Sequence, residues 1–243
     1  MERNTIISKV AEALVHASSS FQADKISAYK RAIDAETNSR ARWVLETILH
    51  NAAIAQDNQS PLCDDTGVPH LFLELGPNKT INGDLLEAIE LGIAEGLRRL
   101  PGRPMAVRGN DCQRIAQSSG LDDDPASVLP GPLIVKRVCE DVIRLHILMQ
   151  GGGPAIRGKT YRIFHKHDIK EVIDEIVAWG VEAVNQLGCT PCTLAIGIGR
   201  SHLEAAALMT EAQIYGRYDV QSELETAITA RINAKSNGAL GLG

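Results

Sequence analysis

The stretch SPLCDDTGVPHLFLELG spans residues 60–76 and decides how the rest of the chain is interpreted. Its second half, HLFLEL, is short, apolar and bounded by Pro69 and Gly76, a pattern that predicts a buried β-strand. Cys63 and the two aspartates that follow it therefore lie on the loop that enters this strand. A thiol and two carboxylates beside a buried strand are candidates for a functional site.

The surrounding sequence predicts a mixed α/β fold. Residues 1–58 repeat apolar side chains at helical spacing, which predicts a helical N-terminal region. Residues 84–100 carry one apolar stripe and predict a further helix. Two apolar runs then predict strands that meet at Glu140 and Asp141. We therefore expect the helical region 1–58 to be followed by a βαβ-containing mixed-sheet domain over residues 59–243.

The last third of the chain predicts helices separated by one strand. Asp168 and Glu171 form an acidic variant of the helix capping box, and Ser201 begins another helix. Between these helices, CTLAIGIG at 192–199 is apolar and predicts a buried strand. Residues 222–234 predict a final helix.

The bulk composition excludes several classes of protein. The chain has 243 residues, of which 44% are hydrophobic, so it can bury a sizeable core. Its formal charge of -5 and aromatic share of 4% give no reason to expect nucleic acid or an anionic membrane surface as a partner. The first residues lack the apolar core of a signal peptide, and no apolar run is long enough to cross a bilayer. We therefore expect a cytoplasmic protein without a membrane anchor.

The cysteines suggest metal ligands or free thiols. Their number, five, is odd, and a chain of this size does not need disulfides. A thiolate such as that of Cys63 is the ligand that iron–sulfur iron prefers, and the nearby Asp65 can orient a hydroxyl or a water. The structural alternative is a small packed cysteine before an acidic turn. Cys189 and Cys192 could bind zinc or act as a redox dithiol, or Cys192 could pack in the core.

Two further stretches carry groups suited to anions. The run GGG at 151–153 leaves backbone N–H groups able to approach an anion, although a glycine bulge at a sheet edge is the structural alternative. Arg108 and Asn110 lie near the start of a long irregular segment, residues 101–132. A guanidinium can bind a carboxylate through two parallel hydrogen bonds, which suits a small dicarboxylic acid. A solvated arginine is the alternative.

Taken in order, these stretches resemble the alpha subunit, or the amino-terminal catalytic domain, of class I fumarases and L(+)-tartrate dehydratases. That family carries C-Q-D-T-G, L-R-x-N, G-G-G, C-P-P and G-x-x-G-L along its chain. The corresponding motifs here are C-D-D-T-G at 63–67, V-R-G-N at 107–110, G-G-G at 151–153, C-T-P at 189–191 and G-A-L-G-L-G at 238–243. The resemblance runs from about residue 40 to the last residue, and five motifs in the same order are more specific than any one alone.

The resemblance implies an iron–sulfur hydro-lyase, which adds or removes water at a small 2-hydroxy (di)carboxylic acid such as malate/fumarate or tartrate. It implies a [4Fe–4S] cluster acting as a Lewis acid, with Cys63 and Cys189 among its ligands. The implied catalytic residues are Asp65 and Thr66, near the substrate, and Arg108, which would hold a carboxylate. The implied substrate-binding residues are Asp64, Asn110, Gly151 and Gly152. A beta subunit, and hence a hetero-oligomer, is also implied.

The sequence departs from the family pattern in three places. Asp64 replaces the customary Gln, and Thr190 replaces the first Pro after the cysteine. An added anion at residue 64 would weaken the binding of an anionic substrate. The family's third cysteine lies downstream of the G-x-x-G-L segment, so the domain ends before this ligand and we do not expect the chain to be active alone. The alternative interpretation is a cluster-free, non-catalytic relative that acts as a binding or assembly module.

Overall fold

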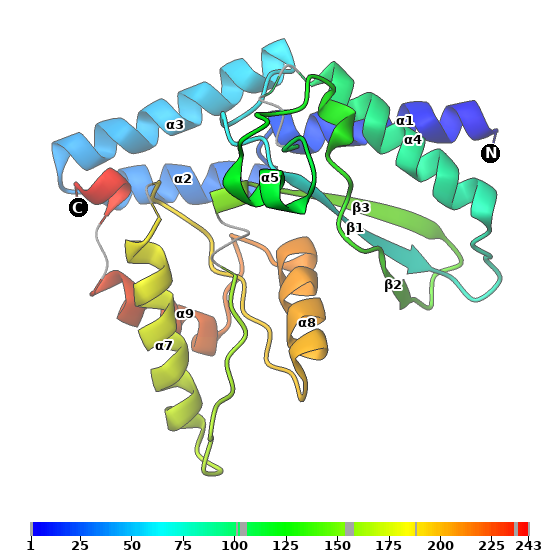
Figure 1. Cartoon of the computed structure of the whole chain (residues 1–243). Helices are drawn as coiled ribbons and strands as arrows, with labels where there is room; N and C mark the ends of the chain where they lie inside the picture. Colours follow the sequence, from blue (N-terminus) through cyan, green and yellow to red (C-terminus); the bar gives the residue numbers. More distant parts are fainter. Residues whose placement is uncertain are drawn as a thin grey trace. The chain divides into compact units, whose positions relative to one another are not determined.

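The computed structural model describes residues 2–100, 102, 106–153, 158–187, 189–235 and 238–242. The chain divides into two compact units: unit 1 comprises residues 1–20 and 52–156, and unit 2 comprises residues 21–51 and 157–243. Figure 1 follows the elements of both units along the chain, from blue to red. The predicted mixed α/β class is confirmed.

A three-stranded sheet forms the centre of unit 1. Its middle strand is β1 (Val68–Leu75), the strand predicted from HLFLEL. On one side β2 (Ile134–Arg137) pairs with β1 in parallel, and on the other side β3 (Ile143–Gln150) pairs with it antiparallel. The helix α4 (Gly83–Arg99) connects β1 to β2, so the predicted βαβ unit is confirmed. The two strands predicted around Glu140 are present, and both flank β1 instead of pairing with each other.

The core of unit 1 lies between this sheet and two helices. Leu71 and Leu73 of β1 are buried with Leu14 of α1 (Arg3–Ser19) and with Ile93 of α4. Figure 1 shows α1 and α4 running along each other. A Cβ atom at Gly92 would lie 2.5 Å from the Cβ of Val10, so glycine permits this close approach of the helices. This packing fixes β1, and therefore the loop that enters it.

The segment predicted to be irregular, 101–132, contains two short helices in its described part. These are α5 (Asp111–Ala116) and the 3-10 helix η1 (Pro125–Ser127). Asp124 accepts a hydrogen bond from the backbone of Ala126 and pairs with Arg98 of α4 at 2.8 Å. The long connection is thus held against α4 instead of running freely through solvent.

Unit 2 is predominantly helical. It contains α2 (Ala23–Ala35), most of α3 (Ser39–Asn58), α7 (Ile169–Asn185), α8 (His202–Tyr215), α9 (Glu223–Asn233) and the 3-10 helix η2 (Ala239–Gly241). The helices predicted for residues 1–58 are confirmed as α1, α2 and α3, the last of which continues from unit 2 into unit 1. One core joins Ile176 and Val184 of α7 to Ile228 and Ile232 of α9.

The predicted helix starts of unit 2 are confirmed. Asp168 accepts a hydrogen bond from the backbone of Lys170 at the start of α7. Ser201 accepts one from Glu204 at the start of α8. Ser222 forms a complete capping box with Glu225 at the start of α9. Capping side chains satisfy backbone N–H groups that have no partner inside the helix, which explains why these positions could be identified from sequence.

The strand predicted at residues 192–199 is wrong. This segment pairs with no strand among the described residues, and Ile196 and Ile198 are exposed. A Cβ atom at Gly197 would lie 2.0 Å from the carbonyl oxygen of Ala205, so the segment packs closely on the backbone of α8. Apolar residues between two helices predicted burial, but a strand also requires a neighbour for its backbone hydrogen bonds.

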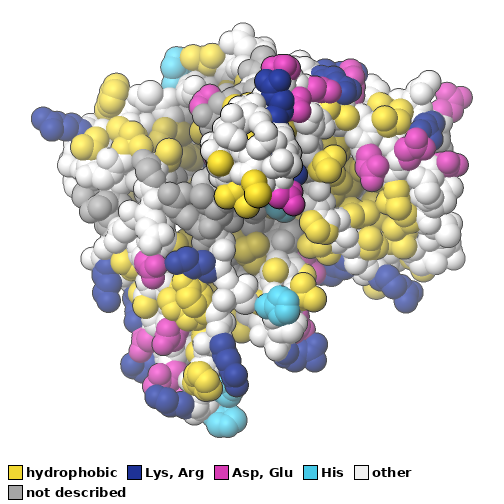
Figure 2. Space-filling model, viewed as in Figure 1, with side chains coloured by type: hydrophobic (Ala, Val, Ile, Leu, Met, Phe, Trp, Pro, Cys, Tyr) yellow, Lys and Arg dark blue, Asp and Glu magenta, His cyan; other side chains and the backbone are white. Residues whose placement is uncertain are grey.

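Charged side chains of both signs are interspersed on the face of the molecule in Figure 2, in keeping with the net charge of -5. Among the helices of the described residues, none is both long and apolar enough to cross a membrane.

Candidate functional site

The carboxylate of Asp65 joins two of the motifs identified in the sequence. Its Oδ1 accepts a hydrogen bond from the backbone N–H of Gly152 at 2.8 Å, and its Oδ2 accepts one from the backbone N–H of Gly153 at 3.1 Å. Both motifs belong to unit 1. Successive backbone N–H groups form a concave site for an anion, and here the anion is the protein's own Asp65 carboxylate. The predicted binding of substrate by Gly151 and Gly152 stays a prediction.

The β1–β3 ladder positions this contact. Val68 lies opposite Gln150, so the loop before β1 meets the segment after β3 at the same end of the sheet. Gly67 has a φ of +91°, a conformation that other residues rarely adopt. A Cβ atom at Gly67 would also lie 2.2 Å from the carbonyl oxygen of Gln150. The glycine of C-D-D-T-G is therefore required both for the backbone turn and for the approach of the two segments.

Cys63 is exposed on this loop, close in sequence to the anchored Asp65. The loop is attached at its start, where the backbone N–H of Leu62 donates to the carbonyl of Ser18 at 2.9 Å. Inside the loop, the backbone N–H of Thr66 donates to the carbonyl of Asp64 at 3.0 Å. The structure thus presents the Cys63 thiol to solvent from a loop that is held at both ends.

Arg108 and Asn110 are both engaged within their own loop. The Nε of Arg108 donates to the carbonyl oxygen of Leu121 at 2.7 Å, and an NH2 group lies 3.4 Å from the carboxylate of Asp123. The guanidinium remains about half exposed, at 47% of its side-chain area. Asn110 caps α5, where its side chain accepts from the backbone N–H of Gln113 at 3.1 Å. Its contribution to substrate binding stays a prediction.

The other two motifs meet in unit 2. The hydroxyl of Thr190 donates to the carbonyl oxygen of Gly238 at 2.6 Å, and the backbone N–H of Leu240 donates to the carbonyl oxygen of Thr190 at 3.2 Å. Thr190 is 8% exposed, and it precedes Pro191 across a cis peptide bond. The Thr that departs from the family pattern therefore provides a hydrogen bond that a proline could not. The last residue of the G-A-L-G-L-G segment, 243, lies outside the described residues.

The two cysteines near this contact differ. Cys189 is exposed at the turn between Asn185, where α7 ends, and the buried Thr190. Of the alternatives for Cys192, packing in the core is wrong, because the residue is exposed and lies on no strand. Partial burial of its thiol nevertheless raises the pKa of Cys192 above the ordinary value, which disfavours the thiolate. Of the pair, Cys189 is the better candidate ligand.

The donor groups of a [4Fe–4S] cluster are thiolates, and the described residues offer some of them. Exposed thiols at Cys63 and Cys189 have the chemistry that cluster iron requires, and the Asp65 contact holds the Cys63 loop in place. In the described parts of the chain, however, no three His, Cys, Asp or Glu side chains gather into one metal-binding group. Each thiol by itself suits cluster iron, and the assignment of Cys63 and Cys189, which belong to different units, to one ligand set stays a prediction.

Sequence reasoning missed three residues of these contacts. Gly153 binds Asp65, whereas Gly151 and Gly152 were the predicted anion-binding glycines. A run of three glycines carries no signal that distinguishes its members, because the choice depends on how the segment leaves β3. In the sequence, Thr190 was noted only because it replaces a proline of the family pattern, and Gly238 only as the first residue of the G-A-L-G-L-G motif. The hydrogen bond between them depends on the tertiary fold, so the sequence carried no signal for it.

The structure thus combines a mixed α/β fold, a glycine run that binds the carboxylate of Asp65, and exposed thiols on loops. Comparison with known proteins gives the family. Residues 7–243 match the family model described as fumarate hydratase (Fumerase), so the chain belongs to this family of hydro-lyases.

The chain is also similar over most of its length to named relatives. A Methanocaldococcus jannaschii protein assigned as L(+)-tartrate dehydratase subunit alpha is 27% identical over 232 residues, which cover 90% of this chain and 78% of the relative. The L(+)-tartrate dehydratase subunit alpha of Escherichia coli K12 is 24% identical over 226 residues, which cover 90% of this chain and 72% of the relative. The protein of the same name from Shigella boydii matches to the same extent. These matches confirm the resemblance inferred from the five motifs.

Proposed function

We propose that this chain is the alpha-type subunit of an iron–sulfur hydro-lyase acting on a small 2-hydroxy (di)carboxylic acid such as malate/fumarate or tartrate. The observation that carries the proposal is the bond between Asp65 and the backbone of Gly152 and Gly153. It brings two family motifs together at the loop that bears Cys63. The family match and the names of the relatives support the type of reaction.

Asp65 is proposed to orient the reacting hydroxyl. Each of its oxygens accepts one backbone hydrogen bond, and a carboxylate oxygen has a second lone pair for a further donor. Because both oxygens are fixed, the free lone pairs point in set directions, and an alcohol hydroxyl can donate to one of them without reorganising the loop. Thr66, the next residue, is proposed to contact the same substrate through its hydroxyl.

Arg108 is proposed to bind a substrate carboxylate. One side of its guanidinium is held by the carbonyl of Leu121, while an arginine carries five N–H donors and this one is half exposed. The remaining donors are available for a carboxylate, which an arginine binds best through two parallel bonds. Asp64, Asn110 and Gly151 are proposed to complete the substrate contacts, whereas the backbone N–H of Gly152, also predicted to bind substrate, is already bonded to Asp65.

Cys63 and Cys189 are proposed to hold the [4Fe–4S] cluster, with a third ligand from outside the described residues. Hydroxide is a poor leaving group, and the cluster would supply a Lewis-acid iron that stabilises charge on the departing oxygen. The residues of this chain would bind and orient the acid beside it.

A beta subunit is proposed as the partner, because the relatives are named as alpha subunits. Activity is therefore expected only from the complex, and a cytoplasmic location is proposed with it. The test is anaerobic co-purification with a tartrate dehydratase-type beta subunit, followed by assays of malate, fumarate and tartrate. We expect turnover of at least one of these acids, with a kcat at least about tenfold lower in Asp65→Asn. A complex with full iron and sulfide content that turns over none of these acids would contradict the proposal.

A cluster-free binding or assembly module is the second candidate. It is favoured by one observation, the lack of a three-ligand metal group within the described ranges. Iron and sulfide analysis of the anaerobic complex separates the two candidates. A stable complex that takes up neither iron nor sulfide on reconstitution supports the module, whereas stoichiometric uptake excludes it.

A further inference from the structure

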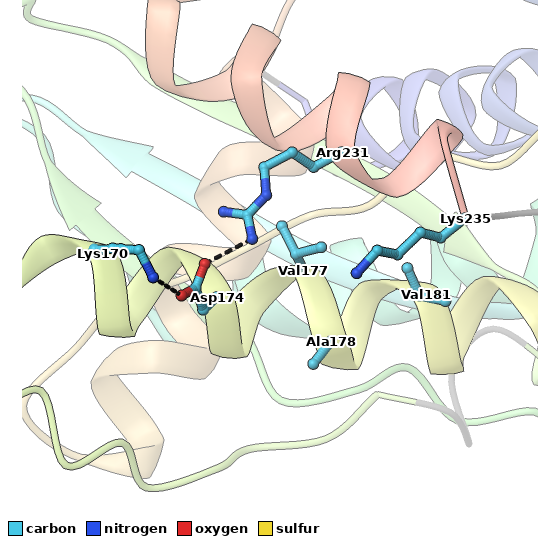
Figure 3. A pocket seen from close by; sticks show the side chains of 7 residues that line it. All are labelled: Lys170, Asp174, Val177, Ala178, Val181, Arg231 and Lys235. Atoms are coloured by element: carbon cyan, nitrogen blue, oxygen red, sulfur yellow. Dashed lines mark hydrogen bonds and ion pairs between the residues drawn. The ribbon is translucent and has the colours of Figure 1, made fainter.

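A groove runs between α7 and α9 within unit 2, and neither the motifs nor the family match assigns it a role. It encloses about 570 Å³, which is in the range of small-molecule sites. Figure 3 shows the side chains that line it. They are Lys170, Asp174, Val177, Ala178 and Val181 from α7, Arg231 from α9, and Lys235 just beyond the end of α9.

The floor of the groove is apolar. Val177 and Val181 are one helical turn apart on α7, with Ala178 beside them, so the three form a continuous aliphatic surface. Val177 is 2% exposed and belongs to the core between α7 and α9. The floor is therefore fixed by packing beneath it, and it can accept an apolar ligand without rearrangement.

The rim of the groove is positively charged. Three cations line it, and Asp174 is its one carboxylate. Asp174 pairs with Lys170 and with Arg231, both at 2.6 Å, as the dashed lines in Figure 3 mark. The bond from Lys170, followed by that from Arg231, lowers the pKa of Asp174, so this carboxylate stays ionised and cannot neutralise more than one of the three cations.

Among the described residues, Lys235 is the cation of this rim for which no counter-ion is found. In the parts of the chain that the structure describes, its amine makes no ion pair or hydrogen bond. Figure 3 shows the Lys235 side chain lying over α7 between Val177 and Val181, while Arg231 reaches over α7 on the other side of Val177. An anionic head group placed between these two cations would have its apolar part on the valine floor.

We propose that this groove binds a small aliphatic carboxylate, whose head group lies between Lys235 and Arg231 and whose chain covers Val177, Ala178 and Val181. The surplus of positive charge selects an anion, and the apolar floor selects one with a hydrocarbon body over an inorganic ion. Arg231 can take part although it binds Asp174, because the guanidinium has further N–H donors. The proposal is independent of the hydro-lyase chemistry, which is assigned to other residues.

The experiment measures binding of a series of straight-chain acids to the full chain by isothermal titration calorimetry at constant ionic strength. The probes are acetate, butanoate and hexanoate, with hexan-1-ol as the uncharged analogue. We expect affinity to rise by about twofold to fourfold for each CH₂ group, since each added group covers more of the valine floor. Hexan-1-ol should bind at least about tenfold more weakly than hexanoate, because it lacks the charge that Lys235 recognises.

Two variants and a control locate the site. Lys235→Gln should weaken hexanoate binding about tenfold, and Val181→Ser should reduce the gain per CH₂ group. Lys166→Gln is the matched control, because Lys166 is an exposed lysine of the same unit that pairs with Glu171 outside the groove, and it should bind like the parent chain. Thermal unfolding confirms that each variant is folded. The proposal is overturned if hexanoate does not bind at millimolar concentration, if Lys235→Gln and the control bind it equally, or if affinity does not depend on chain length.

Discussion

The Oδ1 atom of Asp65 lies 2.8 Å from the backbone nitrogen of Gly152, across 87 residues of sequence. This bond, together with the one from Gly153, closes the end of the sheet at which the Cys63 loop enters β1. The relationship has structural and chemical consequences. It holds the loop in one conformation, and it fixes the direction of the carboxylate that we propose to orient the substrate.

Asp65→Asn tests the structural role of this contact. An amide has one carbonyl oxygen, so one of the two backbone N–H groups would face an NH2 group and lose its partner. We expect the free energy of unfolding to fall by about 1–3 kcal/mol, because a partly buried donor is left unsatisfied. Urea denaturation measures this change, and Asp64→Asn, which removes the same charge at the neighbouring position, is the control. Equal stability of the two variants would show that the contact does not stabilise the loop.

Gly67→Ala tests the close approach beside it. The new Cβ would meet the carbonyl of Gln150, and the φ of +91° would be strained. We expect a loss of at least about 2 kcal/mol in the free energy of unfolding. Gly83→Ala is the control, since a Cβ at this helix start meets nothing within 4 Å, and it should change stability by less than about 0.5 kcal/mol. A mild effect of Gly67→Ala would mean that β1 and β3 can separate at this end.

Much of unit 1 could be predicted because its signals are local. The strand HLFLEL, the helix α4 and the apolar run of β3 were each predicted from the spacing of apolar residues. Capping residues marked the helix starts in unit 2. Residues 192–199 were wrongly predicted to form a strand. A run of apolar residues indicates burial, but it does not show whether a neighbouring strand is present to pair with. The motifs identified Asp65 and Gly152 as candidate site residues. The hydrogen bond between them, and the second bond that Gly153 donates to Asp65, depend on the β1–β3 register and could not be predicted.

Thr190→Val tests the contact between the motifs of unit 2. The substitution keeps the shape of the side chain and removes the hydroxyl that donates to the carbonyl of Gly238. We expect a loss of about 1–2 kcal/mol in the free energy of unfolding, since Thr190 is buried and the carbonyl loses its partner. Chemical denaturation measures the loss, and Thr190→Ser should restore most of it. If Val and Ser variants are equally stable, the hydroxyl does not hold the two motifs together.

Glu204 gives a test of the electrostatics at the start of α8. Hydrogen bonds from the side chain and the backbone of Arg200 lower the pKa of Glu204 from 4.5 to about 2. Because the pKa is lower in the folded state, the stabilisation from this pair is complete above the ordinary value of 4.5 and is lost as the pH falls through about 2. A carbon-13 NMR titration should place the carboxyl midpoint near 2. In Arg200→Gln the midpoint should rise towards 4.5, and an unchanged midpoint would contradict the assigned cause.

The most direct test of the proposed function is the iron and sulfide content of the anaerobically purified complex with its beta subunit, compared among single cysteine variants. We expect Cys63→Ser and Cys189→Ser each to lose the cluster and its visible absorbance. Their far-ultraviolet circular dichroism should be unchanged, because each substitution removes a ligand and leaves the core volume as it was. Cys112→Ser, which replaces an exposed cysteine outside the motifs, should retain both iron and sulfide. Full iron and sulfide content in Cys63→Ser or Cys189→Ser would contradict the central claim that these two thiolates hold one cluster.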